Sequence, residues 1–135
     1  MAWSGDRKSF FFSDSLKHAV FKYDFNDVDG TISGKRILFE VSNGISDGLT
    51  IDADDNLWVA FWGGHRIEKR SGETGEKLAE IIVAAENVTS CCFSGENMNT
   101  LFITTSGDGK KGEHDGCLFK CEVDAVGLEP DYWEG

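Results

Sequence analysis

The chain has 135 residues, of which 24 are acidic, 13 are basic and 16 are glycine, and its net charge is −11. This length suits one domain or part of one, and an apolar content of 40% is enough for a packed core. The acidic balance argues against nucleic acid and against an anionic membrane, because both partners favour a basic protein surface.

The N-terminal stretch MAWSGDRKSF lacks the basic flank and apolar run of a secretory signal. No apolar run approaches the roughly 18 residues that a membrane helix needs. Cys91 and Cys92 are adjacent and would point to opposite faces of a strand, whereas Cys117 and Cys121 would lie about 13 Å apart, too far for a disulfide. We therefore expect reduced thiols and a cytoplasmic location.

Short apolar segments rich in β-branched and aromatic residues follow one another along the chain, which predicts strands rather than helices. Turns rich in Gly, Asp, Asn and Ser separate them. Asp52, Asp54 and Asp55 belong to one such acidic turn. The predicted strands are Ser9–Phe12, Ala19–Phe25, Arg36–Val41, Gly48–Asp52, Leu57–Trp62, His65–Arg70, Lys77–Val83, Ser90–Ser94, Thr100–Thr105 and Cys117–Val123.

These segments repeat: a short strand, an acidic turn, a strongly apolar strand and an amphipathic strand. With Phe11, Trp58 and Phe102 taken as equivalent, the spacings are 47 and 44 residues. A β-rich repeat of about 40 to 50 residues is typical of a propeller blade with four strands. We predict about three four-stranded blades, near residues 1–45, 46–88 and 89–135. A compact β-sandwich is the alternative, although it does not explain the repeat.

Two strands of the middle unit have distinct expected places. The segment LWVAFW, Leu57–Trp62, is apolar throughout and suits a position packed between two blades. The segment HRIEKR, His65–Arg70, alternates and suits an outer strand with one packed face and one wet face. Propellers close with about four to eight blades, so three blades would leave two apolar faces open. The chain is then either part of a larger protein or meets a partner.

Several segments resemble the regucalcin (senescence marker protein), gluconolactonase and luciferin-regenerating enzyme family. They are SDGLTIDADDNLWVAFWGGHRIEKRSGETGEKL, TSCCFSGENMNTLFITT, AWSGDRKSFFFSDS and the closing GLEPDYWEG. The resemblance covers almost the whole chain but only the C-terminal half of a family member. It implies half of a six-bladed propeller, a divalent metal in the central tunnel, and hydrolysis of sugar lactones or related esters.

Asp47 is the candidate catalytic and metal-binding residue. In the family, the aspartate of the Asp-Gly pair at the start of an innermost strand binds the metal, and Asp47-Gly48 matches this pair. The resemblance implies that Asp47 is a metal ligand and the general base that activates water. Carboxylates suit Ca²⁺ first, and Mg²⁺, Mn²⁺ or Zn²⁺ as alternatives. An Asp-Gly pair is also a common turn, which is the competing interpretation.

The other ligands of the family do not match. Its asparagine, in an Asn-Gly pair shortly before Trp-Ser, would precede Met1, and the first-blade glutamate and the substrate-binding residues have no counterpart. One carboxylate does not hold a metal tightly, because Ca²⁺ takes six to eight oxygens. Catalysis would then need ligands from a second copy or another chain that completes the propeller, or from N-terminal sequence ahead of Met1. The alternatives are a non-catalytic, calcium-responsive binding or interaction module and a degenerate fragment without independent function.

Three weaker candidates remain. Asp14, in SDSL, either has a structural role or lines the tunnel. Cys91 or Cys92 could pair with a histidine as a nucleophile, although SCCF is typical of buried small positions. The segment Asp24–Arg36 hints at a calcium-binding EF-hand, but Phe25 and Arg36 occupy its first and last ligand positions. We therefore interpret it as a hairpin loop.

Overall fold

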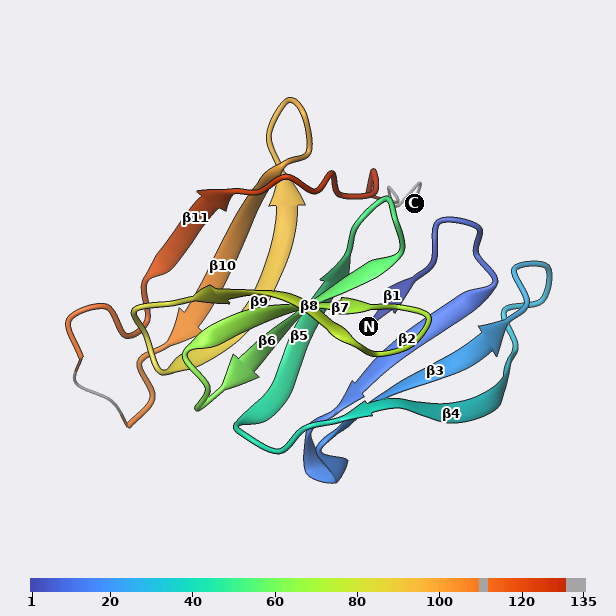
Figure 1. Cartoon of the computed structure of the whole chain (residues 1–135), viewed down its shortest axis with the longest axis horizontal. Coiled ribbons are helices and arrows are strands. Elements are labelled where there is room, and N and C mark those ends of the chain that lie inside the picture. Colours follow the sequence, from blue (N-terminus) through green and yellow to red (C-terminus); the bar gives the residue numbers. More distant parts are fainter. Residues whose placement is uncertain (110–111, 131–135) are drawn as a thin grey trace.

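The computed structural model describes residues 1–109 and 112–130. In these residues the strands form three antiparallel sheets, which lie side by side in chain order (Figure 1). The first sheet is β1 (Ala2–Trp3), β2 (Ser9–Asp14), β3 (Ala19–Phe25) and β4 (Ile32–Glu40), with a short 3-10 helix, η1 (Ser15–Lys17), between β2 and β3. The second sheet is β5 (Ile45–Ile51), β6 (Asn56–Trp62), β7 (Arg66–Ser71) and β8 (Lys77–Ile82). The third is β9 (Asn87–Ser94), β10 (Thr100–Ser106) and β11 (Leu118–Glu122).

This arrangement confirms the predicted all-β blade architecture. Two sheets have four strands each, while the third has three strands within the described residues. The first strand of each sheet lies innermost, since β5 contacts both β1 and β9. Phe11, Trp58 and Phe102 each stand on the second strand, opposite Ala2, Thr50 and Cys92. The repeat inferred from their spacing is therefore a repeat in space.

Two apolar clusters hold the sheets together. In the first junction, Phe11 and Val20 of the first sheet pack against Leu57 and Val59 of the second, as part of one buried cluster. In the second junction, Trp58, Ala60 and Ile67 pack with Val88, Cys91, Phe93, Leu101 and Ile103 of the third sheet. Strand β6 thus contributes to both clusters, as predicted for a strand between two blades.

The acidic turn between β5 and β6 has a structural role. Asp52 is 1% exposed. Its Oδ1 accepts a hydrogen bond from the Asn56 backbone N–H at 2.8 Å, and its Oδ2 accepts one from Trp58 Nε1 at 3.0 Å and lies 2.8 Å from Lys69 Nζ. Burial alone would raise the pKa of Asp52, but the bonds from Lys69, Trp58 and Asn56 outweigh it and lower the pKa. The Asp52 carboxylate therefore bonds to residues of its own blade.

The expectation of one wet face on the segment HRIEKR is wrong. Arg66 and Glu68, on one face of β7, are 9% and 3% exposed, and Ile67, on the other face, is fully buried. The charged face is covered because its side chains pair with one another and stack on rings. The Arg66 guanidinium lies 4.0 Å from the Phe61 ring centre. A charged alternating strand can therefore be packed on both faces.

The chain between the third sheet and residue 130 returns across the other sheets. Gly127 forms an isolated bridge with Asp52, and its N–H donates to the Met98 carbonyl oxygen at 2.7 Å. Leu128 packs on the cluster between the first and second sheets. Residues 131–135 of the family-like segment GLEPDYWEG lie outside the described residues. Among the described residues, no helix is long and apolar enough to cross a membrane.

The loop between β3 and β4 is a tight hairpin, as interpreted from the sequence. Asn26 N–H donates to the Thr31 carbonyl at 2.9 Å, and Gly30 N–H donates to the Asn26 carbonyl at 2.8 Å. Gly30 has a φ of +73°, which favours glycine. The loop's polar side chains serve the turn itself, since Asp29 accepts bonds from Thr31.

Candidate functional site

Asp47 lies in a β-bulge of β5. Ser46 pairs with Phe61 and Leu49 with Val59, so Asp47 and Gly48 together stand opposite the single residue Ala60. An extra residue in one strand locally turns the side chain away from the regular alternation. The bulge explains why Asp47 does not follow the in-and-out pattern of its neighbours, and it places the carboxylate on the innermost strand of the middle blade.

Gly48 allows β5 and β9 to approach closely beside Asp47. A Cβ at position 48 would lie 2.3 Å from Ser90 Oγ and 2.7 Å from the Thr89 carbonyl oxygen. Strand β9 has its own irregularity here, because Thr104 pairs with Ser90 and Thr105 pairs with Val88, leaving Thr89 as the extra residue. Two adjacent innermost strands therefore bulge at corresponding positions, and Asp47 and Thr89 are the residues that these bulges displace.

The residue before Asp47 is fixed from the first sheet. Ser46 is fully buried. Its Oγ accepts a hydrogen bond from Ser13 Oγ at 2.8 Å, and its carbonyl oxygen accepts one from Ser15 Oγ at 2.9 Å. Asp14, between these two serines, caps η1 by accepting from the Lys17 N–H at 3.2 Å. Asp14 thus has a structural contact, while its two neighbours position the strand that carries Asp47.

The Asp47 carboxylate is half-buried, and no hydrogen bond or ion pair joins it to another residue in the described parts of the chain. Burial raises the pKa of Asp47. The pKa of Asp52, five residues later, is lowered instead, because its carboxylate accepts bonds from Lys69, Trp58 and Asn56. A partly desolvated carboxylate without a protein partner is available to a cation or to a proton.

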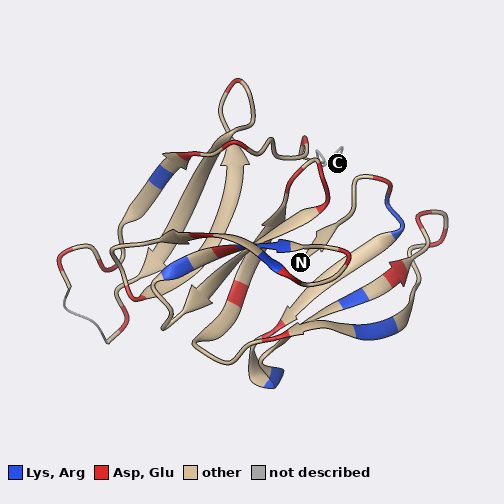
Figure 2. Cartoon of the chain, viewed as in Figure 1, with Lys and Arg blue, Asp and Glu red and all other residues tan. Residues whose placement is uncertain are grey.

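The described residues bring no cluster of metal-binding side chains together around Asp47. Residues 1–109 and 112–130 contain no group of three or more His, Cys, Asp or Glu side chains placed to hold a metal ion. Asp47 fits as one oxygen ligand, since carboxylates are the ligands that Ca²⁺ and Mg²⁺ prefer. Figure 2 shows acidic residues spread over the turns and strands of all three sheets. A metal site at Asp47 therefore needs ligands other than the His, Cys, Asp and Glu side chains of the described residues.

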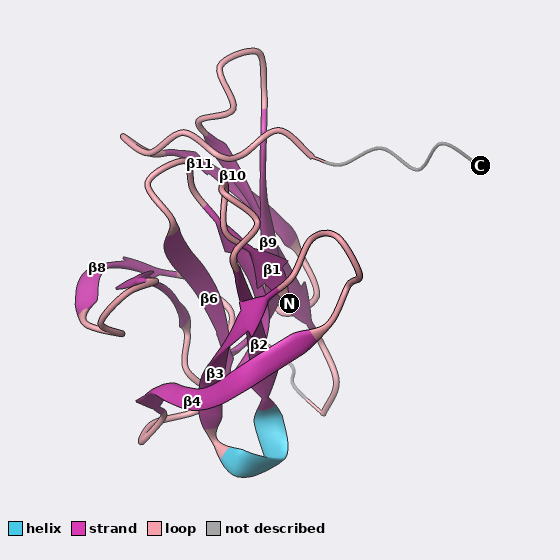
Figure 3. Ribbon diagram, turned by 90° about the vertical axis from the view of Figure 1, so that its right-hand side faces the viewer, coloured by secondary structure: helices cyan, strands magenta, loops and turns pink. Residues whose placement is uncertain are grey.

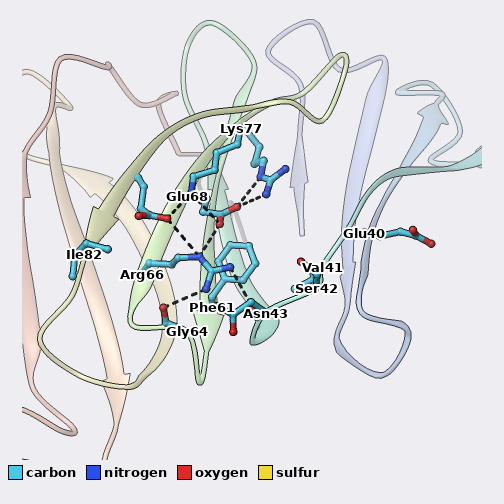
Figure 4. Close-up of a pocket in the computed structure, with 12 residues that line it drawn as sticks. Glu40, Val41, Ser42, Asn43, Phe61, Gly64, Arg66, Glu68, Lys77 and Ile82 are labelled. Carbon is cyan, nitrogen blue, oxygen red and sulfur yellow. Dashed lines mark hydrogen bonds and ion pairs between the residues drawn. The ribbon is translucent and has the colours of Figure 1, made fainter.

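A cavity of about 450 Å³ lies between the end of β4 and the outer strands of the second sheet (Figure 4). Its centre is Glu68, which accepts from Arg66 Nε and Arg70 Nε at 2.7 Å each. Arg66 also donates to the Asn43 and Gly64 carbonyl oxygens at 2.9 and 3.2 Å. Burial would raise the pKa of Glu68, but the two arginines outweigh it and lower that pKa. The two arginines share the Glu68 carboxylate, and the bond from Arg66 to the Asn43 carbonyl oxygen joins β7 to the loop before β5.

The cysteines do not provide a nucleophile in the core. Cys91 is buried, donates from Sγ to the Trp58 carbonyl oxygen at 3.3 Å, and has its pKa raised by burial. A thiol in this state is unreactive. Cys92 is exposed on the opposite face of β9, as adjacent strand residues require, and all four cysteines are free.

Sequence reasoning singled out Asp47 as the candidate but missed the residues that hold its strand. Ser13, Ser15 and Ser46 carry no distinctive spacing, because the bonds that join them span 31 to 33 positions. The available signal was the pair of serines around Asp14, which matches a family segment. The Arg66–Glu68–Arg70 pattern was visible as residues of alternating charge on one face of a strand, although its burial was not.

The chain is similar to known proteins over nearly its whole length. The model of the family described as "SMP-30/Gluconolactonase/LRE-like region" matches residues 1–107. The regucalcin of Danio rerio is 36% identical over 142 residues, which cover 98% of this chain and 48% of that protein. An uncharacterized protein of Sulfolobus acidocaldarius is 38% identical over 134 residues, with 98% and 48% covered.

Solved structures agree with this result. A luciferin-regenerating enzyme matches with a TM-score of 0.87 and 33% identity, over 94% of this chain and 45% of that one. A calcium-binding regucalcin of Agrobacterium tumefaciens matches with a TM-score of 0.81 over 94% and 46%, and its 19% identity shows the fold alone.

The chain spans about half the length of the curated relatives it matches. The solved structures that it matches are six-bladed propellers, and the chain covers about half of each. This coverage agrees with the three sheets of the chain. The matched segment includes Asp47, Gly48 and the serines that position them. The chain therefore belongs to the SMP-30/gluconolactonase/LRE-like family.

Proposed function

We propose that this chain supplies half of a divalent-metal-dependent hydrolase that opens sugar lactones or similar esters. The observation that carries the proposal is the Asp47 carboxylate, half-buried on an innermost strand and without a partner among the described residues. The family includes proteins named gluconolactonases, one of them from Xanthomonas campestris, which supports the reaction class.

The proposed role of Asp47 is to hold a cation and to accept the proton of an attacking water. A carboxylate that is desolvated but unpaired is a stronger proton acceptor than one in bulk water, because burial disfavours its charged form. Ser13 and Ser15 restrict its strand through Ser46, so the carboxylate is held in place before substrate arrives. A bound divalent ion, Ca²⁺ first and Mg²⁺, Mn²⁺ or Zn²⁺ as alternatives, would supply a Lewis acid for the lactone carbonyl.

The test is hydrolysis of gluconolactone by the purified chain, with and without Ca²⁺, Mn²⁺ or Zn²⁺, beside Asp47→Asn. The matched control is Asp54→Asn, which removes an acidic group from an exposed turn. We expect metal-dependent turnover that falls at least about 100-fold in Asp47→Asn, as for loss of a general base, and that survives in Asp54→Asn. Equal activity in both variants would remove Asp47 from the mechanism.

A second function is supported by the incomplete ligand set in the described residues. In this case the chain binds calcium or a protein partner without catalysis. Calcium binding lost in Asp47→Asn, together with no turnover above background under any metal, would favour this module over the hydrolase.

A further inference from the structure

The described chain leaves two blade faces uncovered, one on each outer sheet. Figure 3 views the molecule from the side of the first sheet. The face of this sheet that points away from the second sheet is aromatic, because its side chains alternate with those of the buried cluster. Its members are Trp3, Phe10, Phe12, Phe21, Tyr23, Phe25 and Ile37, of which Phe21 is only 6% exposed and has Lys35 stacked on its ring. We call this the aromatic face.

The third sheet has the other uncovered face, around a mostly apolar hollow of about 380 Å³ lined by Ser90, Cys91, Cys92, Ser94, Phe102, Thr104 and Leu118. Phe102 lies at the centre of its sheet, between Cys92 of β9 and Lys120 of β11. Leu118 is 65% exposed. We call this the Phe102 face.

The two internal junctions show which faces fit each other. At the first junction Phe11, the central aromatic residue of the first sheet, packs with residues on the second strand of the second sheet. At the second junction Trp58, the central aromatic residue of the second sheet, packs with residues on the second strand of the third sheet. Those residues are Leu57 and Val59 at the first junction and Leu101 and Ile103 at the second. By the same repeat, Phe102 is the next central aromatic, and Phe10 and Phe12 occupy the positions that would receive it.

We propose that the Phe102 face of one chain packs against the aromatic face of a second copy, and the reverse, so that two chains close a six-bladed ring. Each chain provides three blades, and the same junction occurs twice about a two-fold axis along the tunnel. A closed arrangement of this kind leaves neither face open. In this arrangement a second copy of this chain covers both faces.

The area is sufficient for a stable dimer. Strands about 4.8 Å apart with a rise of about 3.3 Å per residue give each face roughly 300–400 Å². Two junctions, each made of two such faces, remove on the order of 1,300 Å² from solvent, and stable interfaces bury about 1,200–2,000 Å². The net charge of −11 opposes association, so the apolar contact at the two junctions must outweigh this repulsion.

The dimer also bears on the candidate site. Closure about the tunnel axis would bring Asp47 of both copies to the same tunnel, where each would add an oxygen ligand that the described residues of one chain do not gather. This second step rests on the proposed function, whereas the dimer rests only on the two faces.

The test is the solution mass of the 135-residue chain by light scattering and sedimentation velocity. We expect twice the chain mass of 14.9 kDa, independent of concentration in the micromolar range. Phe12→Lys and Phe102→Glu should each be monomeric, and their mixture should regain a dimer, because one junction is then native and the other pairs Lys with Glu. Val28→Lys and Val28→Glu, at a site that is 96% exposed in a loop, are the matched controls and should remain dimeric.

Far-UV circular dichroism of each variant separates loss of association from loss of fold. A folded wild-type monomer would overturn the proposal and would leave both faces for another chain. A series of growing oligomers would also overturn it, because the ring would not close.

Calcium titration then tests the shared site, for which we expect one ion per two chains. A dimer without lactone hydrolysis would refute only the proposed function, and hydrolysis by a monomer would refute only the dimer.

Discussion

Gly48 is the position where a single methyl group should test the geometry around Asp47. In Gly48→Ala, the new Cβ would stand 2.6 Å from Ser90 Cβ and 2.7 Å from the Thr89 carbonyl oxygen. Rotation of the Ser90 side chain could move its hydroxyl, but it cannot move its Cβ or the backbone of β9. The clash can be relieved only if β5 and β9 separate beside the Asp47 bulge.

We expect this separation to cost about 2–3 kcal/mol of unfolding free energy, at the upper end of typical overpacking. For a chain of this size the melting temperature should fall by roughly 6–12 °C. Urea unfolding followed by circular dichroism gives the free energy. The matched control is Gly5→Ala, whose Cβ would meet Leu128 at an ordinary 3.5 Å. A change below about 0.5 kcal/mol in Gly48→Ala would refute the close approach of the two strands.

Three other outcomes follow from buried groups. Asp52→Asn should destabilise the chain by about 3 kcal/mol at pH 7, because it leaves the partly buried Lys69 ammonium and two buried N–H donors without a charged partner. The lowered folded-state pKa of Asp52 means that its contribution is present above the unfolded pKa near 3.8 and is lost as pH falls below it. Urea unfolding at neutral and acid pH measures both effects, and equal loss at pH 7 and pH 2 would contradict them. Ser13→Ala should cost about 1–3 kcal/mol by thermal unfolding, because the buried Ser46 hydroxyl loses its donor, and an unchanged melting temperature would argue against this bond. In the folded protein, a thiol reagent should modify the exposed Cys117 rapidly and Cys91 only after unfolding, and comparable rates at the two sites would show that Cys91 is not buried.

The sequence was sufficient to predict the blades because their signal is local. Each strand is a short β-branched or aromatic run, each turn carries its own glycine or acidic residue, and the repeat places Phe11, Trp58 and Phe102 on equivalent strands. The buried place of β6 followed from its unbroken apolar run. The burial of Arg66 and Glu68 did not follow, because it depends on Phe61 and on the loop at Asn43, which reach β7 only after folding.

Only the part of the candidate site that is local in sequence was predicted. The Asp47-Gly48 pair is a local motif that the resemblance made specific, and its assignment as ligand and base remains a prediction. The bulges on β5 and β9 and the serine contacts to Ser46 are properties of paired strands. Such contacts join residues more than 30 positions apart, and single-sequence patterns do not encode them.

The most direct measurement is a calcium titration of the 135-residue chain in which NMR follows the side-chain carboxyl carbons of Asp47 and Asp54. The account predicts that the Asp47 resonance shifts and saturates, while the resonance of the exposed Asp54 stays in place. An Asp47 resonance that does not move at saturating Ca²⁺, Mg²⁺ or Zn²⁺ would contradict the claim that this carboxylate is a metal ligand.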